Sequence, residues 1–257
     1  MARVIAIANQ KGGVAKTTTA ITVASALVEL GQRVLLIDLD PQACATFALG
    51  TDPEDLRRDE SMAMVLDHVD PSALGTSMRK AIRQTDDGVH LIPGSMELAS
   101  ADLTLAARAG RERVLATGLD GIREDFDFVI FDCSPSLGLM TINALIAASE
   151  VIVPVKCETL SHRGLGQLME TIDDVRHWAN PDLVVSGIVP TLFDGRTAHA
   201  QAVLADLAPR YGAPVFDAIP RSIRFAESPA IGRTILATSP SSAGARAYRK
   251  VAQALLD

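Results

Sequence analysis

The sequence predicts an α/β fold, with a mostly parallel twisted sheet and helices on both of its faces. Short apolar runs, such as VLLI at 34–37 and VIVPV at 151–155, are bounded by polar residues, glycine or proline. Segments with helical periodicity separate these runs through most of the chain. Strands that alternate with helices favour a parallel sheet that is covered on both sides.

The expected strands are 3–8, 33–38, 89–92, 128–132, 151–155, 184–190 and 215–219. The expected helices are 16–30, 96–108, 112–124, 141–148, 164–178, 198–211 and 243–256, and Gly31 ends the first of them. Residues 51–60 form the most loop-like segment. Since no linker or repeat divides the chain, we expect one domain over residues 1–257.

Length and composition indicate a soluble globular protein. The chain has 257 residues, of which 48% are apolar and 21% charged, so it can bury a full core. No apolar run approaches the roughly 18 residues that a membrane helix needs. The start, MARVIAIANQ, enters a glycine loop directly and leaves no room for a cleavable signal, so we expect a cytoplasmic protein.

Charge and cysteine usage narrow the class further. The net charge of −7 argues against a protein that is basic over its whole surface. A local basic excess near the C-terminus still predicts an interaction surface; it comprises Arg196, Arg210, Arg221, Arg224, Arg233, Arg246, Arg249 and Lys250 against Asp206, Asp217 and Glu227. The three cysteines, Cys44, Cys133 and Cys157, are far apart, and we expect buried or half-buried free thiols.

The stretch NQKGGVAKTT, residues 9–18, follows the first expected strand and precedes the first expected helix. The usual phosphate-loop pattern requires glycine at positions 10 and 15, where this chain has Gln10 and Ala15. A turn that brings backbone N–H groups and a helix N-terminus to one point still makes a phosphate site. We expect any positive φ in this loop at Gly12 or Gly13 and not at Ala15.

The two residues that end the loop carry the expected chemistry. Lys16 supplies a positive charge for the β- and γ-phosphates, and the Thr17 hydroxyl is a ligand for Mg²⁺. The alternative interpretation is a glycine-rich turn in which threonine caps the helix.

Carboxylates stand at the ends of two other expected strands. VIFD ends on Asp132, which suits a contact with Mg²⁺ through water. LLIDLDPQ places Asp38 at the strand end and Asp40 just past it, and only one of them needs to face the nucleotide. We select Asp40, as a metal ligand and as the residue that positions or polarises the attacking water. The alternative is that Asp40 only begins the turn at Pro41.

The segment KGGVAKTT resembles the deviant Walker A motif of the ParA/MinD family of ATPases, whose pattern K-G-G-x-x-K-[ST] leaves position 15 open. The resemblance continues through LLIDLDPQ, FDFVIFDCSPSLG, VIVPVKCETLSHRGLGQL, GIVPTLFDGRT, IPRSIRFAESPAIGRTIL and SSAGARAYRKVAQAL. It covers nearly the whole chain, favours the chromosomal ParA (Soj) branch and implies a P-loop NTPase fold.

The resemblance also implies ATP or ADP and Mg²⁺ as cofactors, and a homodimer that forms when ATP binds. In such a dimer Lys11 reaches the phosphates in the partner subunit, so Lys11 joins Lys16 and Asp40 as a catalytic residue. Pro220 is expected beside the adenine. The implied nucleotide-binding residues are Lys11, Gly12, Gly13, Val14, Ala15, Lys16, Thr17, Thr18 and Pro220.

By the same resemblance Arg196, Arg221 and Arg224 contact double-stranded DNA without reading its sequence. The alternatives are that Arg221 packs near the adenine and that Arg196 pairs with Asp194. A ParB-like centromere-binding protein is the expected partner, and ATP hydrolysis is expected to be slow without it. We therefore expect a nucleoid-associated ATPase that segregates DNA and does not bind membranes. The alternatives are a MinD-like membrane-associated or cargo-positioning ATPase and a metabolic or electron-transfer enzyme built on the same loop.

Overall fold

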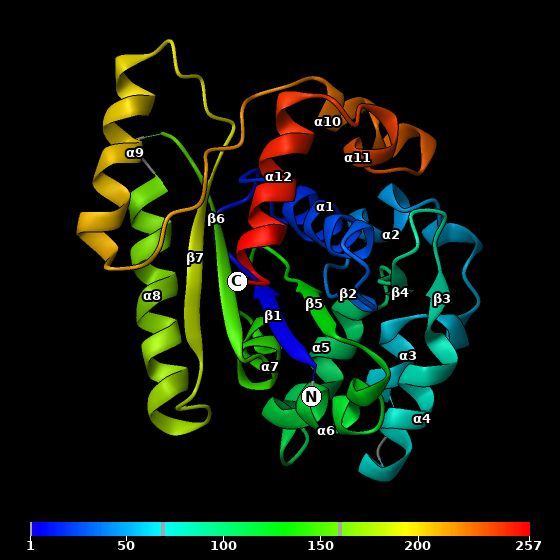
Figure 1. Cartoon of the computed structure of the whole chain (residues 1–257). Helices are drawn as coiled ribbons and strands as arrows, with labels where there is room; N and C mark the ends of the chain where they lie inside the picture. The colour runs from blue at the N-terminus through cyan, green and yellow to red at the C-terminus, as the bar shows by residue number, and fades with distance from the viewer. Residues whose placement is uncertain (1, 68–69, 159–160) are drawn as a thin grey trace.

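The computed structural model describes residues 2–67, 70–158 and 161–257. Within these residues a seven-stranded sheet has the order β3-β4-β2-β5-β1-β6-β7 (Figure 1). The strands are β1 (Arg3–Ile7), β2 (Val34–Asp38), β3 (Arg83–Gln84), β4 (His90–Ile92), β5 (Phe128–Asp132), β6 (Glu150–Lys156) and β7 (Val184–Thr191). The described neighbours pair in parallel except for β3 with β4, which confirms the expected mostly parallel sheet.

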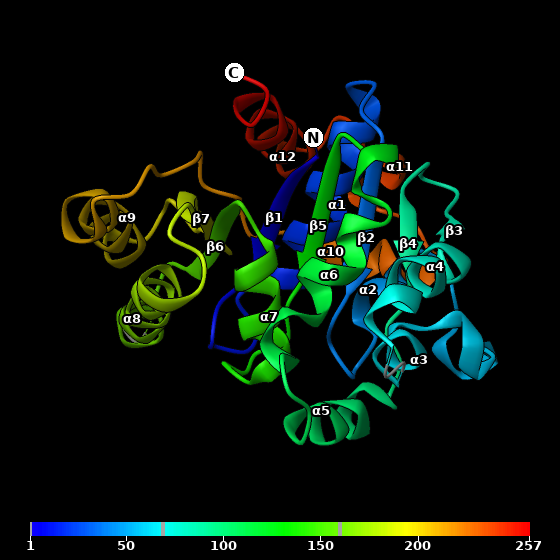
Figure 2. The ribbon, with the colours of Figure 1, turned by 90° about the horizontal axis from the view of Figure 1, so that it is seen from below.

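The described helices are α1 (Lys16–Glu29), α2 (Cys44–Ala48), α3 (Met62–Asp67), α4 (Pro71–Ala81), α5 (Leu98–Ala106), α6 (Val114–Asp120), α7 (Leu139–Ala147), α8 (Ser161–Trp178), α9 (Ala198–Tyr211), α10 (Arg224–Glu227), α11 (Ile235–Thr238) and α12 (Ala243–Ala254). They lie on both sides of the sheet, as Figure 2 shows from below. Helices α1 and α12 pack on one face, and α3 to α8 cover the other.

Alternate residues of the central strands contribute to two separate cores. In β1, Ile5 and Ile7 join the core beneath α1 and α12, whereas Val4 and Ala6 join the opposite one. This division follows from the two-residue period of a strand. Because both faces are covered, β2 and β5 are buried throughout and their sequences are apolar runs that end in an acid.

Several expected elements differ from the structure. Residues 215–219 do not form a strand. Val215 makes an isolated bridge to Ile188 of β7, and the Ile219 N–H donates to the carbonyl of Pro190, but these contacts do not form a continuous ladder. Helix 112–124 is shorter, with α6 flanked by 3-10 turns at Arg111–Arg113 and Arg123–Asp125. The loop at 51–60 also contains two 3-10 turns, and Cys44 is exposed rather than buried because it starts α2 at the surface.

Candidate functional site

The loop between β1 and α1 is held in place from the neighbouring strands. The side chain of Asn9 donates to the carbonyl of Pro154 in β6 at 2.7 Å and accepts from the Lys11 N–H at 2.9 Å. Thr191, at the end of β7, donates to the carbonyl of Val14 at 3.0 Å. These bonds give the loop a defined shape without a ligand. The sequence prediction did not include Asn9 or Thr191, although asparagine is a frequent turn former.

The backbone of the loop confirms one expectation and corrects another. Gly13 has a φ of 71°, in the left-handed region, as expected. Ala15 also lies there, with φ 66° and ψ 37°, so the expectation for Ala15 is wrong. Its carbonyl accepts from both the N–H and the hydroxyl of Thr19, at 2.9 and 2.7 Å, and these bonds hold the strained residue at the start of α1. The conformation costs about 1–2 kcal/mol for a residue other than glycine.

Lys16 points across the inside of the loop. Its ammonium donates to the carbonyl of Lys11 at 3.2 Å, and only 7% of the residue is exposed. Burial lowers the pKa of Lys16, and the nearby carboxylates of Asp132 and Asp40 oppose this change. The cation therefore lies between the phosphate loop and the acids at the strand ends, where an anionic phosphate would be attracted.

Asp132 ends β5 directly beside Asp38, which ends β2, and both carboxyl groups are fully buried. Neither oxygen of Asp132 accepts a hydrogen bond of normal geometry among the described residues. Burial and the neighbouring Asp38 raise the pKa of Asp132 well above its usual value, while the nearby Thr17 hydroxyl and the charge of Lys16 oppose the shift. An acid with two orphaned oxygens next to a threonine hydroxyl is suited to a hydrated cation.

Asp38 has the opposite environment. One of its oxygens accepts from the N–H and the hydroxyl of Thr46 at 2.9 and 2.7 Å, and the other accepts from the Asp40 N–H at 3.1 Å. Burial nevertheless raises the pKa of Asp38 to about 6. Thr46 in turn accepts from the Gly94 N–H at 2.9 Å, so Asp38 ties α2 and the end of β4 to β2. Thr46 was missed because it lies outside the recognisable motif.

Asp40 is half-buried and lies near enough to Lys16 for its carboxylate to favour the charged form of Lys16. One oxygen of Asp40 accepts from the Gln42 N–H at 3.0 Å, and its carbonyl accepts from the Ala43 N–H at 2.8 Å. The residue thus begins the turn after β2 and also presents a carboxylate at the edge of the site. With Asp38 committed to internal hydrogen bonds, Asp40 is the acid of this pair that is available to a ligand.

A metal ion at the phosphate loop would need ligands beyond the protein side chains. Among the described residues no group of three or more histidine, cysteine, aspartate or glutamate side chains is arranged to hold a metal ion. Mg²⁺ in phosphate-binding proteins takes one or two protein oxygens and completes its shell with phosphates and water. Thr17 and Asp132 fit that pattern, because Thr17 supplies one hydroxyl and the orphaned carboxylate of Asp132 suits a water molecule of the cation.

Known proteins resemble the chain over its full length. A family model for an AAA domain (AAA_31) matches residues 2–185. The chromosome-partitioning ATPase Soj of Thermus thermophilus is 42% identical over 255 residues, which cover 99% of this chain and 95% of that protein. The chromosome partitioning protein ParA of Caulobacter vibrioides is 38% identical over 257 residues, with 99% and 94% covered. The chain belongs to the ParA/Soj family of partitioning ATPases.

Solved structures agree with this fold. A cobyrinic acid a,c-diamide synthase from Mycobacterium smegmatis with bound ADP and magnesium has a TM-score of 0.84 and 49% identity, covering 100% of this chain and 94% of that one. The cell division ATPase MinD of Pyrococcus furiosus has a TM-score of 0.76 and 25% identity, with 100% and 99% covered. Both comparisons confirm the predicted P-loop NTPase fold of the ParA/MinD type.

Lys11, the signature lysine of the ParA/MinD motif, points away from its own loop. Its ammonium lies 4.0 Å from the carboxylate of Glu158, which itself pairs with Lys156 at 2.6 Å. Glu158 follows β6; Thr159 and Leu160 of the same expected motif lie outside the described residues. Gly12 and Gly13 are exposed, Val14 is buried, and Thr17 and Thr18 are half-buried at the start of α1.

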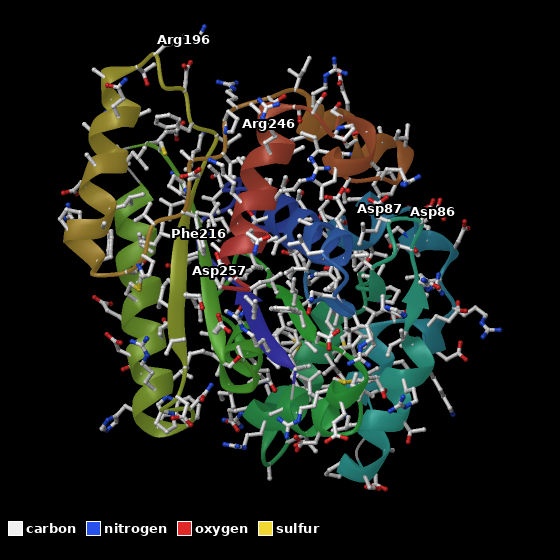
Figure 3. All side chains as sticks on the ribbon, in the orientation of Figure 1. Asp86, Asp87, Arg196, Phe216, Arg246 and Asp257 are labelled. Atoms are coloured by element: carbon white, nitrogen blue, oxygen red, sulfur yellow. The ribbon has the colours of Figure 1, made fainter. Side chains whose placement is uncertain are left out.

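The residues that the ParA/Soj resemblance assigns to DNA and adenine lie on separate segments. Arg196 stands at the tip of the connection between β7 and α9 (Figure 3), and its guanidinium pairs with both oxygens of Asp194 at 2.9 and 2.7 Å. Arg221 is exposed, and Arg224, at the start of α10, lies 3.6 Å from Glu227. The pairing of Arg196 with Asp194 was the stated alternative. Pro220 is half-buried in a shallow pocket with Arg246 and Lys250 of α12.

Proposed function

We propose that this chain is a Mg²⁺-dependent ATPase that hydrolyses ATP to ADP and phosphate and acts in DNA segregation. The observation that carries the proposal is the orphaned carboxylate of Asp132 beside Lys16 and Thr17 at the phosphate loop. Such a set fits a nucleotide phosphate together with its cation. The M. smegmatis relatives, at 49% identity, hold ADP or an ATP analogue together with magnesium. We assign the activity to one domain spanning residues 1–257.

Each residue of the site has a distinct part in the proposed reaction. The loop residues 11–18 bind the phosphates through backbone N–H groups and the N-terminus of the 14-residue helix α1. Lys16 neutralises charge on the β- and γ-phosphates. Thr17 and Asp40 hold Mg²⁺, with Asp132 acting through water, and the bound cation supplies charge stabilisation at the phosphates. Asp40 also positions the attacking water, and Pro220 lies beside the adenine.

Lys11 supports a dimer that forms when ATP is bound. Its side chain extends toward Glu158 instead of its own loop, and a surface pair at 4.0 Å contributes at most about 1 kcal/mol. Breaking that pair is therefore inexpensive. In a face-to-face dimer Lys11 would neutralise phosphate charge in the partner subunit, so ATP would favour the dimer through contacts that ADP lacks. Hydrolysis without a partner is expected to be slow.

The arginines support non-specific DNA binding by that dimer. Arg221 and Arg224 are exposed, and the Arg224–Glu227 pair is a weak surface pair. Arg196 is 90% exposed, but the bidentate pair with Asp194 must open or share its guanidinium before Arg196 contacts a phosphate. We therefore expect Arg224 to contribute more than Arg196. A ParB-like protein is the partner that we propose, and the cellular place is the nucleoid in the cytoplasm.

A membrane role is less well supported than DNA binding. Within residues 2–67, 70–158 and 161–257, no helix combines the length and the apolar content of a membrane span. The apolar side of α12 is also unavailable for a peripheral contact, because Tyr248, Val251 and Leu255 are buried in the core beneath α1. We therefore favour DNA over lipid as the surface to which the protein binds.

The name of the M. smegmatis structure suggests a second candidate function, amide synthesis. Release of ammonia from glutamine commonly requires a cysteine thiolate. Burial raises the pKa of Cys133 strongly and that of Cys157 to about 11, and it also raises the pKa of Cys44. Burial thus disfavours the thiolate form of each cysteine, so the three cysteines do not support glutamine hydrolysis.

Binding to arbitrary duplex DNA and to anionic liposomes, measured with ATP, ADP and no nucleotide over a range of salt, tests the proposal. We expect salt-sensitive DNA binding that requires ATP, and no liposome binding. Liposome binding with ATP would overturn the partitioning role. Within the site, Lys16→Ala should lose nucleotide, whereas Asp40→Ala should retain ATP and the dimer. Undiminished turnover in the Asp40 variant would refute the role of Asp40.

A further inference from the structure

A buried hydrogen-bond chain joins the C-terminal helix to the phosphate loop. Tyr248 of α12 is fully buried, and its hydroxyl lies 2.9 Å from the hydroxyl of Thr19 in α1. Thr19 gives its single hydroxyl proton to the carbonyl of Ala15 at 2.7 Å. Tyr248 must therefore be the donor in its bond to Thr19. This series of hydrogen bonds ends at Ala15, the strained residue that closes the phosphate loop.

The aromatic ring of Tyr248 contacts a different part of the molecule. Phe225 of α10 meets it edge-on, with ring centroids 5.8 Å apart and an interplanar angle of 86°. Phe225 also packs against the backbone of α12 at Gly244, where an added Cβ would lie 2.6 Å from the ring. An edge-to-face pair with so little free space fixes the position of α10 relative to α12.

Helix α10 carries the arginine for which we proposed DNA contact. Arg224 directly precedes Phe225, and its side chain is exposed while Phe225 is half-buried. Ile223, before Arg224, is 73% exposed. One side of this short segment is thus fixed by Tyr248, and the residues next to it face solvent. Figure 1 shows α12 crossing next to α1, with α10 near the N-terminal end of α12.

We propose that Tyr248 is a positioning residue that couples the phosphate loop to α10. Its hydroxyl is linked to the phosphate loop by hydrogen bonds through Thr19 to Ala15. Its ring packs against Phe225 and so fixes the position of the adjacent Arg224. A change in the loop on nucleotide binding then alters the order of α10, and by thermodynamic reciprocity a ligand on α10 alters nucleotide affinity. The DNA part of this inference rests on the proposed function, but the structural coupling does not.

Amide hydrogen exchange tests the coupling without DNA. In the wild type, a non-hydrolysable ATP analogue with Mg²⁺ should slow exchange in a peptide from the loop and also in the peptide 223–232. In Tyr248→Phe, which keeps the ring, the analogue should still slow the loop peptide, whereas the slowing at 223–232 should decrease about three- to tenfold, as expected for one lost hydrogen bond. Tyr211→Phe, at the end of α9, is the matched control and should behave like the wild type.

A second pair of variants separates positioning from a general loss of stability. Thr19→Val should reduce the slowing at 223–232 as Tyr248→Phe does, whereas Thr19→Ser, which keeps the hydroxyl, should retain that slowing. The double variant Thr19→Val with Tyr248→Phe should lose no more of the slowing than either single variant. Equal slowing at 223–232 in the wild type and Tyr248→Phe, or no slowing there in the wild type, would overturn the inference. DNA titration of the same proteins is read separately. A wild type that binds no DNA refutes the proposed function and leaves the exchange data to decide the coupling.

Discussion

Replacing Asp132 by asparagine should have opposite effects on the free protein and on its complex. The variant keeps the size of the side chain and removes the charge of a fully buried carboxylate whose oxygens both lack partners among the described residues. Without Mg²⁺ and nucleotide we expect Asp132→Asn to raise the free energy of unfolding. With Mg²⁺ and ATP the variant should lose the part of ligand stabilisation that requires the metal.

The pKa of the neighbouring Asp38 gives the scale of the expected gain in stability. Its pKa rises from 3.8 to about 6 although it accepts three hydrogen bonds, and this change corresponds to about 3 kcal/mol. Burial shifts the pKa of Asp132 in the same direction, opposed by the Thr17 hydroxyl and the charge of Lys16, so we use the Asp38 figure as the scale for Asp132. An unpaired buried amide still costs about 1–2 kcal/mol. The expected net gain for Asp132→Asn is therefore about 1–2 kcal/mol, or about 3–6 °C in Tm for a chain of this size.

The free energy of unfolding should also change with pH in a definite direction. Both acids have folded-state pKa values above the ordinary 3.8, so between that value and the folded pKa the native state binds more protons than the unfolded state. The free energy of unfolding must then decrease as pH rises through this interval. The penalty is absent below about pH 4 and complete above the folded pKa values. Asp132→Asn should flatten this decrease, so its advantage should grow from pH 4 to pH 8.

Thermal and urea unfolding at several pH values, with and without Mg²⁺ and ATP, measure both effects. Asp38→Asn is the matched control, because Asp38 is equally buried on the adjacent strand but is fully hydrogen-bonded. Its change in the free energy of unfolding should be about 1–2 kcal/mol less favourable than that of Asp132→Asn, because an amide cannot accept from every donor around Asp38. If Asp132→Asn destabilises the metal-free protein, or if it keeps the full Mg²⁺-dependent increase in Tm, the metal role of Asp132 is refuted.

Two further predictions concern backbone strain and are measured by urea unfolding. Ala15→Gly should raise the free energy of unfolding by about 0.5–1 kcal/mol, because glycine relieves the left-handed strain but also increases the entropy of the unfolded chain. As a control, Ala26→Gly inside α1 should lower the free energy of unfolding by about 1 kcal/mol. A loss in both variants would contradict the strain at Ala15. Gly232→Ala should lower the free energy of unfolding by about 2–4 kcal/mol, because the added Cβ would lie 2.6 Å from the backbone of Gly50. Gly31 has a similar φ but open space around it, so Gly31→Ala should lower the free energy of unfolding by only about 1 kcal/mol. Equal losses at Gly232 and Gly31 would exclude that contact as the cause.

The sequence could predict the elements whose signal is local. The central strands β2 and β5 were found because they are buried on both faces and therefore read as continuous apolar runs. The six-residue helix α3 and the two-residue strand β3 were missed because they are too short to show a period. Helix α4 was also missed, although its 11 residues bury Leu74, Met78 and Ala81 on one side. The expected strand at 215–219 was wrong because an apolar run does not reveal whether its backbone completes a ladder.

The same division holds within the site. Lys16, Thr17 and Asp132 could be selected because the order of strand, loop and helix places them. Asn9 and Thr191 could not, since their loop-fixing bonds join residues 145 and 177 positions apart in the chain. Tyr248 lies 229 positions from Thr19, and a single tyrosine in a closing helix carries no signal for such a bond.

These long-range bonds explain how the loop functions with neither of the two glycines of the usual pattern. Gln10 does not adopt a positive φ, so glycine has no conformational advantage there. Ala15 does adopt one, and its strain is offset because Thr19 holds its carbonyl twice and Tyr248 supports Thr19. The shape of the loop is therefore imposed by α1, α12, β6 and β7 more than by its own residues. A loop fixed from outside in this way transmits a change in its ligand to the elements that hold it, which is what a nucleotide-controlled switch requires.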